Sequence, residues 1–316
     1  MTKLKVKMFF AYNETNILRL GAQLLLGIQL QETLGADFRK LPHHSQYLHA
    51  GATTVMLLGL GLLIAPSAYH RIVDKGAPSE NLRTFTSRII SLAIVPFVLG
   101  LGVEFDIILT KVASTELGVI SAVVVMAVGF ALLYGWFLRG RANAPAMQAY
   151  KERSAMKEND SEDRNAGASM NEKVMYALME TQMILPGVQV LIGFQGGAAM
   201  SEGFNDLPAV SKTVYVISLA LLSLTMLLLM MPVSYHRYVE QGEATENFLE
   251  FTSRVLVWSM IPFGIGMCGN LFVVLFKVSG SLLIAASGSA AMSLTFYCLW
   301  FGYTMRCRRQ CRAEAG

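Results

Sequence analysis

Long hydrophobic runs with almost no charge alternate along the chain with short polar segments. The clearest runs cover residues 50–65, 89–103, 117–133, 214–231, 255–274 and 282–301. A helix needs roughly 20 such residues to cross the hydrocarbon core of a bilayer. Backbone groups find no water in lipid, and the runs do not alternate between polar and apolar positions. They therefore predict transmembrane helices rather than the strands of a barrel.

Two further segments, 17–34 and 183–200, are dense in apolar residues but also contain glutamines. We count both as membrane spans, because they occupy equivalent positions in an internal repeat. Their polarity predicts that they face other helices or a cavity rather than lipid.

The chain contains two copies of one sequence unit. A constant offset of 166 residues aligns positions 14–112 with 180–278 without a gap. The matches fall mostly on polar, glycine, proline and aromatic residues, while the aliphatic residues differ. The main shared elements are Glu14-Thr15 with Glu180-Thr181, Leu41-Pro42 with Leu207-Pro208, Tyr69-His70-Arg71 with Tyr235-His236-Arg237, and Phe85-Thr86-Ser87-Arg88 with Phe251-Thr252-Ser253-Arg254.

The repeat predicts an all-α polytopic membrane protein with eight transmembrane helices in two four-helix repeats of the same orientation. The expected spans are 17–34, 47–66, 89–110 and 117–138, then 183–200, 213–232, 255–276 and 282–303. The expected domains are a first repeat at 1–138, a cytoplasmic linker at 139–173, a second repeat at 174–305 and a basic cytoplasmic tail at 306–316.

Charge and composition support this topology. The sequence is 53% hydrophobic and 15% charged, whereas a soluble domain carries about a quarter charged residues. Lysine and arginine gather in the N-terminal segment, the loop after the second span, the linker and the tail. All of these lie on one side in the eight-span topology, so that side, with both termini, is predicted to be cytoplasmic.

The repeated pattern E-T-x5-G-x-Q-x3-G-x-Q, followed by P-x-x-Y-H-R and F-T-S-R, resembles a bacterial family of small four-span membrane proteins of unknown function. Its members often carry the label sodium:proton antiporter. The resemblance covers nearly the whole chain, which looks like a tandem fusion of two such units. It implies a location in the bacterial inner membrane.

Polar residues recur where the spans reach the predicted cytoplasmic side. We expect Glu14 to meet Arg71 and Arg88 in the first copy, and Glu180 to meet Arg237 and Arg254 in the second. This arrangement is either an ion-pair clamp between helices or a positively charged site for an anion, with pH sensitivity from the histidines. The other members of the cluster are Tyr69, His70, Ser87, Tyr235, His236 and Ser253.

The spans themselves carry a few polar side chains. The glutamines either bond between helices or line a hydrated path. The copies differ where the first has Glu104 and the second has Asn270. Glu104 is either a functional intramembrane acid, for example a proton carrier, or a hydrogen-bonded carboxyl, or it follows a span that ends near Val103. The glutamines are Gln23 and Gln29 in the first copy and Gln189 and Gln195 in the second.

These features favour a small-ion or proton-linked secondary transporter or channel. The alternative is a non-transporting scaffold, sensor or accessory protein. We expect no enzymatic activity, because the spans contain no catalytic pair, and no cofactor or metal site, because His43 and His44 lack a third ligand. The expected partners are the lipid bilayer and small ions or protons, with no nucleic acid. A homo-oligomer stays open, since a single-unit relative would need to dimerise to form the same pair.

Overall fold

The computed structural model describes residues 3–75, 79–142, 170–240 and 245–314. At some helix ends it describes the backbone alone, at 3–12, 132–142, 170–173, 236–238 and 311–314. Most of the expected linker, residues 143–169, therefore lies outside the described residues.

All secondary structure within the described ranges is helical, which confirms the all-α prediction. The predicted spans match the long helices but are shorter than them; span 89–110, for example, lies within a helix that begins at Glu80. The long helices are α1 (Lys3–Thr33), α2 (His43–Ile72), α3 (Glu80–Val112), α4 (Thr115–Ala142), α6 (Met170–Ala199), α8 (Ala209–Tyr238), α9 (Glu246–Ser279) and α10 (Leu282–Tyr297). Helix α10 continues through the π-helical turn η2 (Cys298–Tyr303) into α11 (Thr304–Glu314), and two short connectors are η1 (Phe38–Lys40) and α7 (Glu202–Asn205).

Within the described ranges, six helices are long and apolar enough to cross a membrane: α2, α3, α6, α8, α9 and the continuous α10–α11. The chain is thus a membrane-embedded helical protein by length and composition. Helix α3 continues past Val103 to Val112, so Glu104 lies within the helix rather than after its end.

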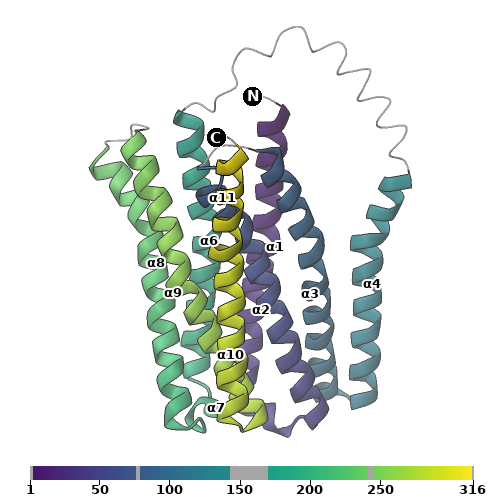
Figure 1. The fold of residues 1–316 in the computed structure, drawn as a ribbon. Coiled ribbons are helices and arrows are strands. Elements are labelled where there is room, and N and C mark those ends of the chain that lie inside the picture. Colours follow the sequence, from purple (N-terminus) through teal and green to yellow (C-terminus); the bar gives the residue numbers. More distant parts are fainter. Residues whose placement is uncertain (1–2, 76–78, 143–169, 241–244, 315–316) are drawn as a thin grey trace.

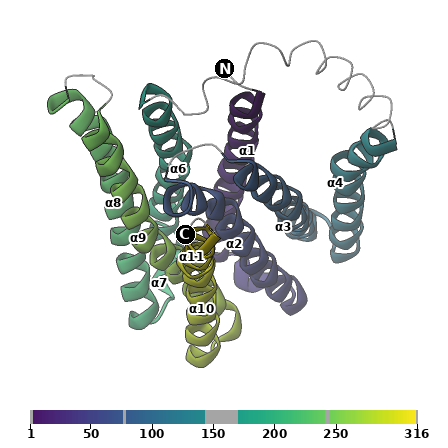
Figure 2. The same cartoon turned by 45° about the horizontal axis from the view of Figure 1, so that its top comes forward.

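Helices α1 and α6 pack against each other in the middle of the bundle (Figure 1). Helices α2 and α3 flank α1, while α8 and α9 flank α6. Helix α10 lies against α9 and α2, and α4 packs on α3 at one edge, opposite α8 (Figure 2). The first helix of each copy is therefore central, and Gln23, Gln29 and Gln195 on these helices are buried.

Glycines allow the close approach of α1 and α6. A Cβ atom placed on Gly187 would lie 1.4 Å from Oε1 of Gln23, and one on Gly27 would lie 2.3 Å from Cδ2 of Phe194. A larger residue at either position would displace the facing side chain, so both helices present a glycine where the other inserts a side chain.

The start of α1 and the end of α11 lie at the same end of the bundle, which we call the N/C end (Figure 1). Helices α3 and α9 begin there with equivalent caps: Oγ of Ser79 accepts from N of Leu82 at 3.0 Å, and Oγ1 of Thr245 accepts from N of Phe248 at 3.1 Å. The connectors η1 and α7 lie at the opposite end.

Candidate functional site

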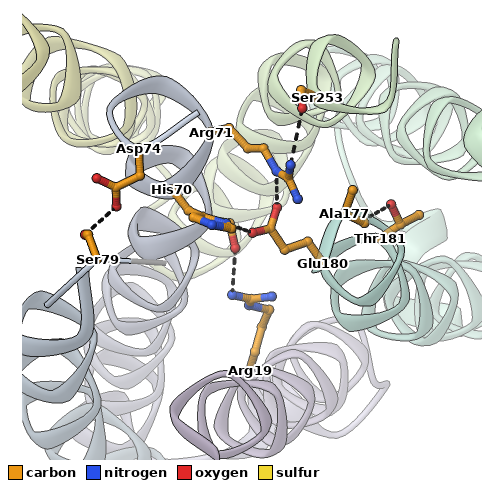
Figure 3. Close-up of polar contacts among 10 residues, drawn as sticks. Arg19, His70, Arg71, Asp74, Ser79, Ala177, Glu180, Thr181 and Ser253 are labelled. Carbon is orange, nitrogen blue, oxygen red and sulfur yellow. Dashed lines mark hydrogen bonds and ion pairs between the residues drawn. The ribbon is translucent and has the colours of Figure 1, made fainter. Parts of the chain in front are cut away.

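A buried ion-pair cluster lies at the N/C end between α2 and α6. Glu180 is 1% exposed, and each of its carboxylate oxygens contacts a nitrogen of α2. Oε1 contacts Nδ1 of His70, and Oε2 accepts from Nε of Arg71. Arg71 also donates from Nη1 to Oγ of Ser253 on α9 at 3.2 Å (Figure 3). These contacts tie one helix of the first copy to two helices of the second.

A second buried guanidinium lies beside this cluster. Arg19 of α1 is fully buried and donates from Nη2 to the carbonyl oxygen of Leu63 at 2.8 Å and to Oγ of Ser67 at 3.3 Å, both on α2 (Figure 3). Arg19 was not among the residues predicted from the sequence. It could have been found as an arginine within the expected span 17–34, where the second copy has Leu185.

A different polar cluster lies in the other half of the bundle, between α1, α2 and α3. One carboxylate oxygen from each of Glu32 and Glu104 and one ring nitrogen of His49 all lie within 4.8 Å of one another. His49 and Glu104 are buried, whereas the side chain of Glu32 is 27% exposed. The fully buried side chain of Gln29 approaches the carboxyl of Glu104 without a hydrogen bond of ordinary geometry. We call these four residues the copy-one cluster.

The backbone around His49 fixes the orientation of its ring. Its Nε2 lies 3.0 Å from the carbonyl oxygen of Gln29, which can only accept a hydrogen bond. Nε2 therefore carries the proton, and Oγ1 of Thr33, 2.9 Å away, accepts from it as well. In the neutral ring, Nδ1 then presents a lone pair and lies 4.0 Å from Oε2 of Glu32.

Several polar atoms of the copy-one cluster have no hydrogen-bond partner among the described residues. Among the described residues, no hydrogen-bond partner reaches Nδ1 of His49, Oε2 of Glu32, either carboxylate oxygen of Glu104, or the side-chain amide atoms of Gln29. Buried polar groups in folded proteins are usually paired, so this concentration of unpaired acceptors calls for an explanation.

The second copy builds the same geometry without the ionisable groups. At the offset of 166 residues, Glu104 corresponds to Asn270, His49 to Tyr215 and Glu32 to Ala198. Nε2 of Gln195 donates to Oδ1 of Asn270, and the hydroxyl of Tyr215 donates to the carbonyl oxygen of Gln195. The bundle therefore folds around this position with neutral side chains, and the charge of the first copy is a separate property.

A cavity lies beside Glu32, at the end of the bundle opposite the N/C end. Its volume is about 260 Å³, and Glu32 lines it together with Asp37 and Lys111. Asp37 pairs with Nζ of Lys111 and with Nζ of Lys40, each at 2.8 Å. Glu32 thus stands between a charged cavity mouth and the buried His49 and Glu104.

A family model described as a family of unknown function (DUF6328) matches residues 12–138 and 165–304. The chain belongs to this family. No curated protein and no solved structure matches the chain.

In this DUF6328 chain, the expected pairing of Glu180 needs correction. Glu180 meets His70 and Arg71 of the first copy, whereas Arg254 is exposed and pairs with Glu250. The physical reason is that α6 packs against α1 of the first copy, which brings Glu180 within reach of the long side chains at the end of α2. The side chains of His236 and Arg237 lie outside the described residues.

The first-copy half of the expected cluster does not assemble either. Glu14 and Arg88 are exposed, and Ser87 is exposed and donates to the carbonyl oxygen of Arg83 at 3.0 Å. The two tyrosines pack on neighbouring rings: Tyr69 lies 5.3 Å from Phe85 between ring centroids, and Tyr235 lies 4.3 Å from Phe251.

The structure also separates the expected intramembrane residues. Gln29 and Glu104 come together in the first copy, as Gln195 and Asn270 do in the second. Gln23 is fully buried against Gly187 at the α1–α6 contact, whereas Gln189 is exposed. The sequence analysis missed His49 and gave Glu32 no role, although comparison of the copies would have marked both as ionisable residues replaced in the second copy.

The ion pair at the cavity mouth predicts a specific pH dependence. Hydrogen bonds from Lys111 and Lys40 lower the pKa of Asp37 from 3.8 to about 2. A lowered pKa contributes stability that is present above the ordinary value and is lost as pH falls through the folded value. The difference in melting temperature between the wild type and Asp37→Asn should therefore be constant above about pH 4 and shrink towards pH 2. A difference that stays constant down to pH 2 would contradict the ion pair.

Proposed function

We propose that the protein is a small-ion or proton-linked secondary transporter or channel, with the copy-one cluster as its ion-binding site. One observation carries this proposal: unpaired acceptor atoms of Glu104, His49 and Gln29 gather in the interior of a bundle of membrane-length helices. Such groups are costly in a low-dielectric interior unless a ligand or a partner satisfies them.

Comparison of the two copies supports a functional rather than a structural role for these residues. Residues needed only for packing would be expected in both copies, but the second copy has Asn270, Tyr215 and Ala198 at the corresponding positions. The contact between Gln195 and Asn270 joins α6 to α9 without charge. Ion binding explains why the first copy keeps two carboxyls and an imidazole there.

We further infer eight membrane crossings, with α1 and α4 added to the six long apolar helices, and with both termini on the cytoplasmic side of a bacterial inner membrane. The shared end of the first and last helices supports an even number of crossings (Figure 1). The basic residues near the N/C end, such as Arg71, Lys75 and Arg308, support a cytoplasmic location for that end. The two arrays of four helices correspond to the tandem copies.

A second candidate is a non-transporting scaffold or sensor. It is favoured by the separation of the cavities: one of about 730 Å³ lies at the N/C end, lined in part by Arg71 and Trp258, and shares no lining residue with the cavity beside Glu32. A void of only about 20 Å³ lies between the copies, roughly the room for one water molecule. A transporter would need to open a path past this packing.

Ion flux distinguishes these candidates. The purified protein would be reconstituted into liposomes that contain a pH-sensitive or cation-sensitive dye, and proton and cation gradients would be applied in turn. The proposal predicts flux in the wild type and a loss of about tenfold or more in Glu104→Gln, as expected when a ligand of an ion site is removed.

Asp106→Asn is the matched control, because Asp106 is a buried acid on the same helix that accepts from Oγ of Ser45 at 3.2 Å and is outside the cluster. Its flux should equal that of the wild type. No wild-type flux for any ion would favour the scaffold, and undiminished flux in Glu104→Gln would exclude the cluster as the ion site.

A further inference from the structure

We propose that the copy-one cluster binds a divalent transition-metal cation. This inference rests on the proposed function in that it names the class of ion, but metal binding is measured separately from transport. Its basis is the donor set: one imidazole nitrogen and two carboxylates converge between α1, α2 and α3, with no hydrogen-bond partner at Nδ1 of His49 or at either oxygen of Glu104 among the described residues.

The mixture of donors selects the class of cation. Ca²⁺ and Mg²⁺ take oxygen ligands, whereas an imidazole nitrogen is a preferred ligand of zinc, iron, nickel and copper. The imidazole of His49 and the carboxylates of Glu32 and Glu104 are ligand types that divalent transition-metal ions bind in proteins. Two carboxylates also balance a charge of two, so the occupied site would be neutral inside the bundle.

The orientation of His49 is that of a metal ligand. A ligating histidine usually donates its other ring N–H to a carbonyl or carboxylate, which fixes the tautomer and aims the free nitrogen at the metal. Here Nε2 donates to the carbonyl oxygen of Gln29, and Nδ1 faces Glu32 without a hydrogen-bond partner among the described residues. Tyr215 keeps only the first of these contacts in the second copy.

The distances are compatible with closure around an ion. The three ligand atoms lie within 4.8 Å of one another, and ligands of a tetrahedral zinc ion are separated by about 3.4 Å. Both oxygens of Glu104 lack other partners among the described residues, so its carboxylate can move without breaking a hydrogen bond. Glu32 reaches the cavity of about 260 Å³ and gives the ion a way in from the surface.

The competing explanation is that the two carboxyls share a proton. Adjacent carboxylates in a low-dielectric site cannot both stay ionised, so one proton can take the place of a cation. A shared proton leaves the site without metal affinity, and a direct binding measurement therefore separates the two explanations.

The experiment uses the full-length protein in lipid nanodiscs, freed of metal with a chelator and titrated calorimetrically with Zn²⁺. We expect one saturable site per chain, weakened about 10–100-fold or more in His49→Tyr. We expect no site in the triple variant Glu32→Ala, His49→Tyr, Glu104→Asn, which gives the first copy the residues of the second. These substitutions already pack in the second copy, and circular dichroism with size-exclusion chromatography would verify folding.

A double variant, His43→Ala with His44→Ala, controls for zinc on exposed histidines and should keep the site. Absence of saturable zinc binding in the folded wild type, or equal binding by the triple variant, would overturn the proposal. Zinc binding without any ion flux would remove the proposed function but keep the metal site. Proton flux without zinc binding would keep the proposed function but remove the metal site.

Discussion

Replacement of Glu180 by glutamine should destabilise the protein by about 3–5 kcal/mol, the usual effect of removing one partner from a buried ion pair. Glu180 is 1% exposed and accepts from Arg71 while contacting His70. The neutral amide leaves the guanidinium of Arg71 buried without a counter-charge. Because this pair joins α2 to α6, the loss weakens the contact between the two copies.

The repeat provides a matched control for this variant. Glu14 occupies the same position in the first copy but is exposed, so Glu14→Gln should change stability by less than about 0.5 kcal/mol. Chemical denaturation in detergent micelles would measure both, and Arg71→Ala should resemble Glu180→Gln. Equal stabilities of the two glutamine variants would show that the ion pair does not hold the copies together.

A leucine at Gly187 should destabilise the α1–α6 contact by about 1–3 kcal/mol or more, as overpacking in a core does. The added Cβ would lie 1.4 Å from Oε1 of Gln23, so α1 and α6 must separate or Gln23 must leave its site. Since both helices are central, the change would spread to the helices that flank them.

Gly193 is the control on the same helix, six residues further along. A Cβ there meets nothing within 4 Å, and leucine has a higher helix propensity than glycine by roughly 1 kcal/mol. Gly193→Leu should therefore be neutral or slightly stabilising in the same denaturation experiment. If Gly187→Leu proved equally harmless, the close approach of α1 and α6 would be contradicted.

The hydrophobic pattern predicted the helices well because a membrane span leaves a long, uniform signature. Even the weak segments 17–34 and 183–200 lie almost entirely within α1 and α6, and the central positions of these helices account for the buried Gln23, Gln29 and Gln195 but not for the exposed Gln189. The predicted spans are shorter than the helices, because α3 and α9 extend beyond their apolar parts to the caps at Ser79 and Thr245.

The partners of the polar residues could not be predicted from one chain with two similar copies. Both copies carry the same Tyr-His-Arg element, so the sequence does not tell whether Glu180 meets its own copy or the other. The packing of α1 against α6, with close approaches at Gly27 and Gly187, decides that.

The copy-one cluster was partly accessible from sequence. Glu104 was recognised because an acid within a span is conspicuous. His49 was missed because it lies near the start of α2, apart in the sequence from every predicted site residue. Its role emerges only when α1, α2 and α3 bring it to Glu32 and Glu104. Differences between the copies, rather than their identities, carried the signal.

Flux through the triple variant Glu32→Ala, His49→Tyr, Glu104→Asn tests most directly whether the first copy holds the functional site. Under conditions in which liposomes with the wild-type protein transport ions, liposomes with the folded triple variant should pass ions no faster than liposomes without protein. Transport by the folded triple variant at the wild-type rate would contradict the account.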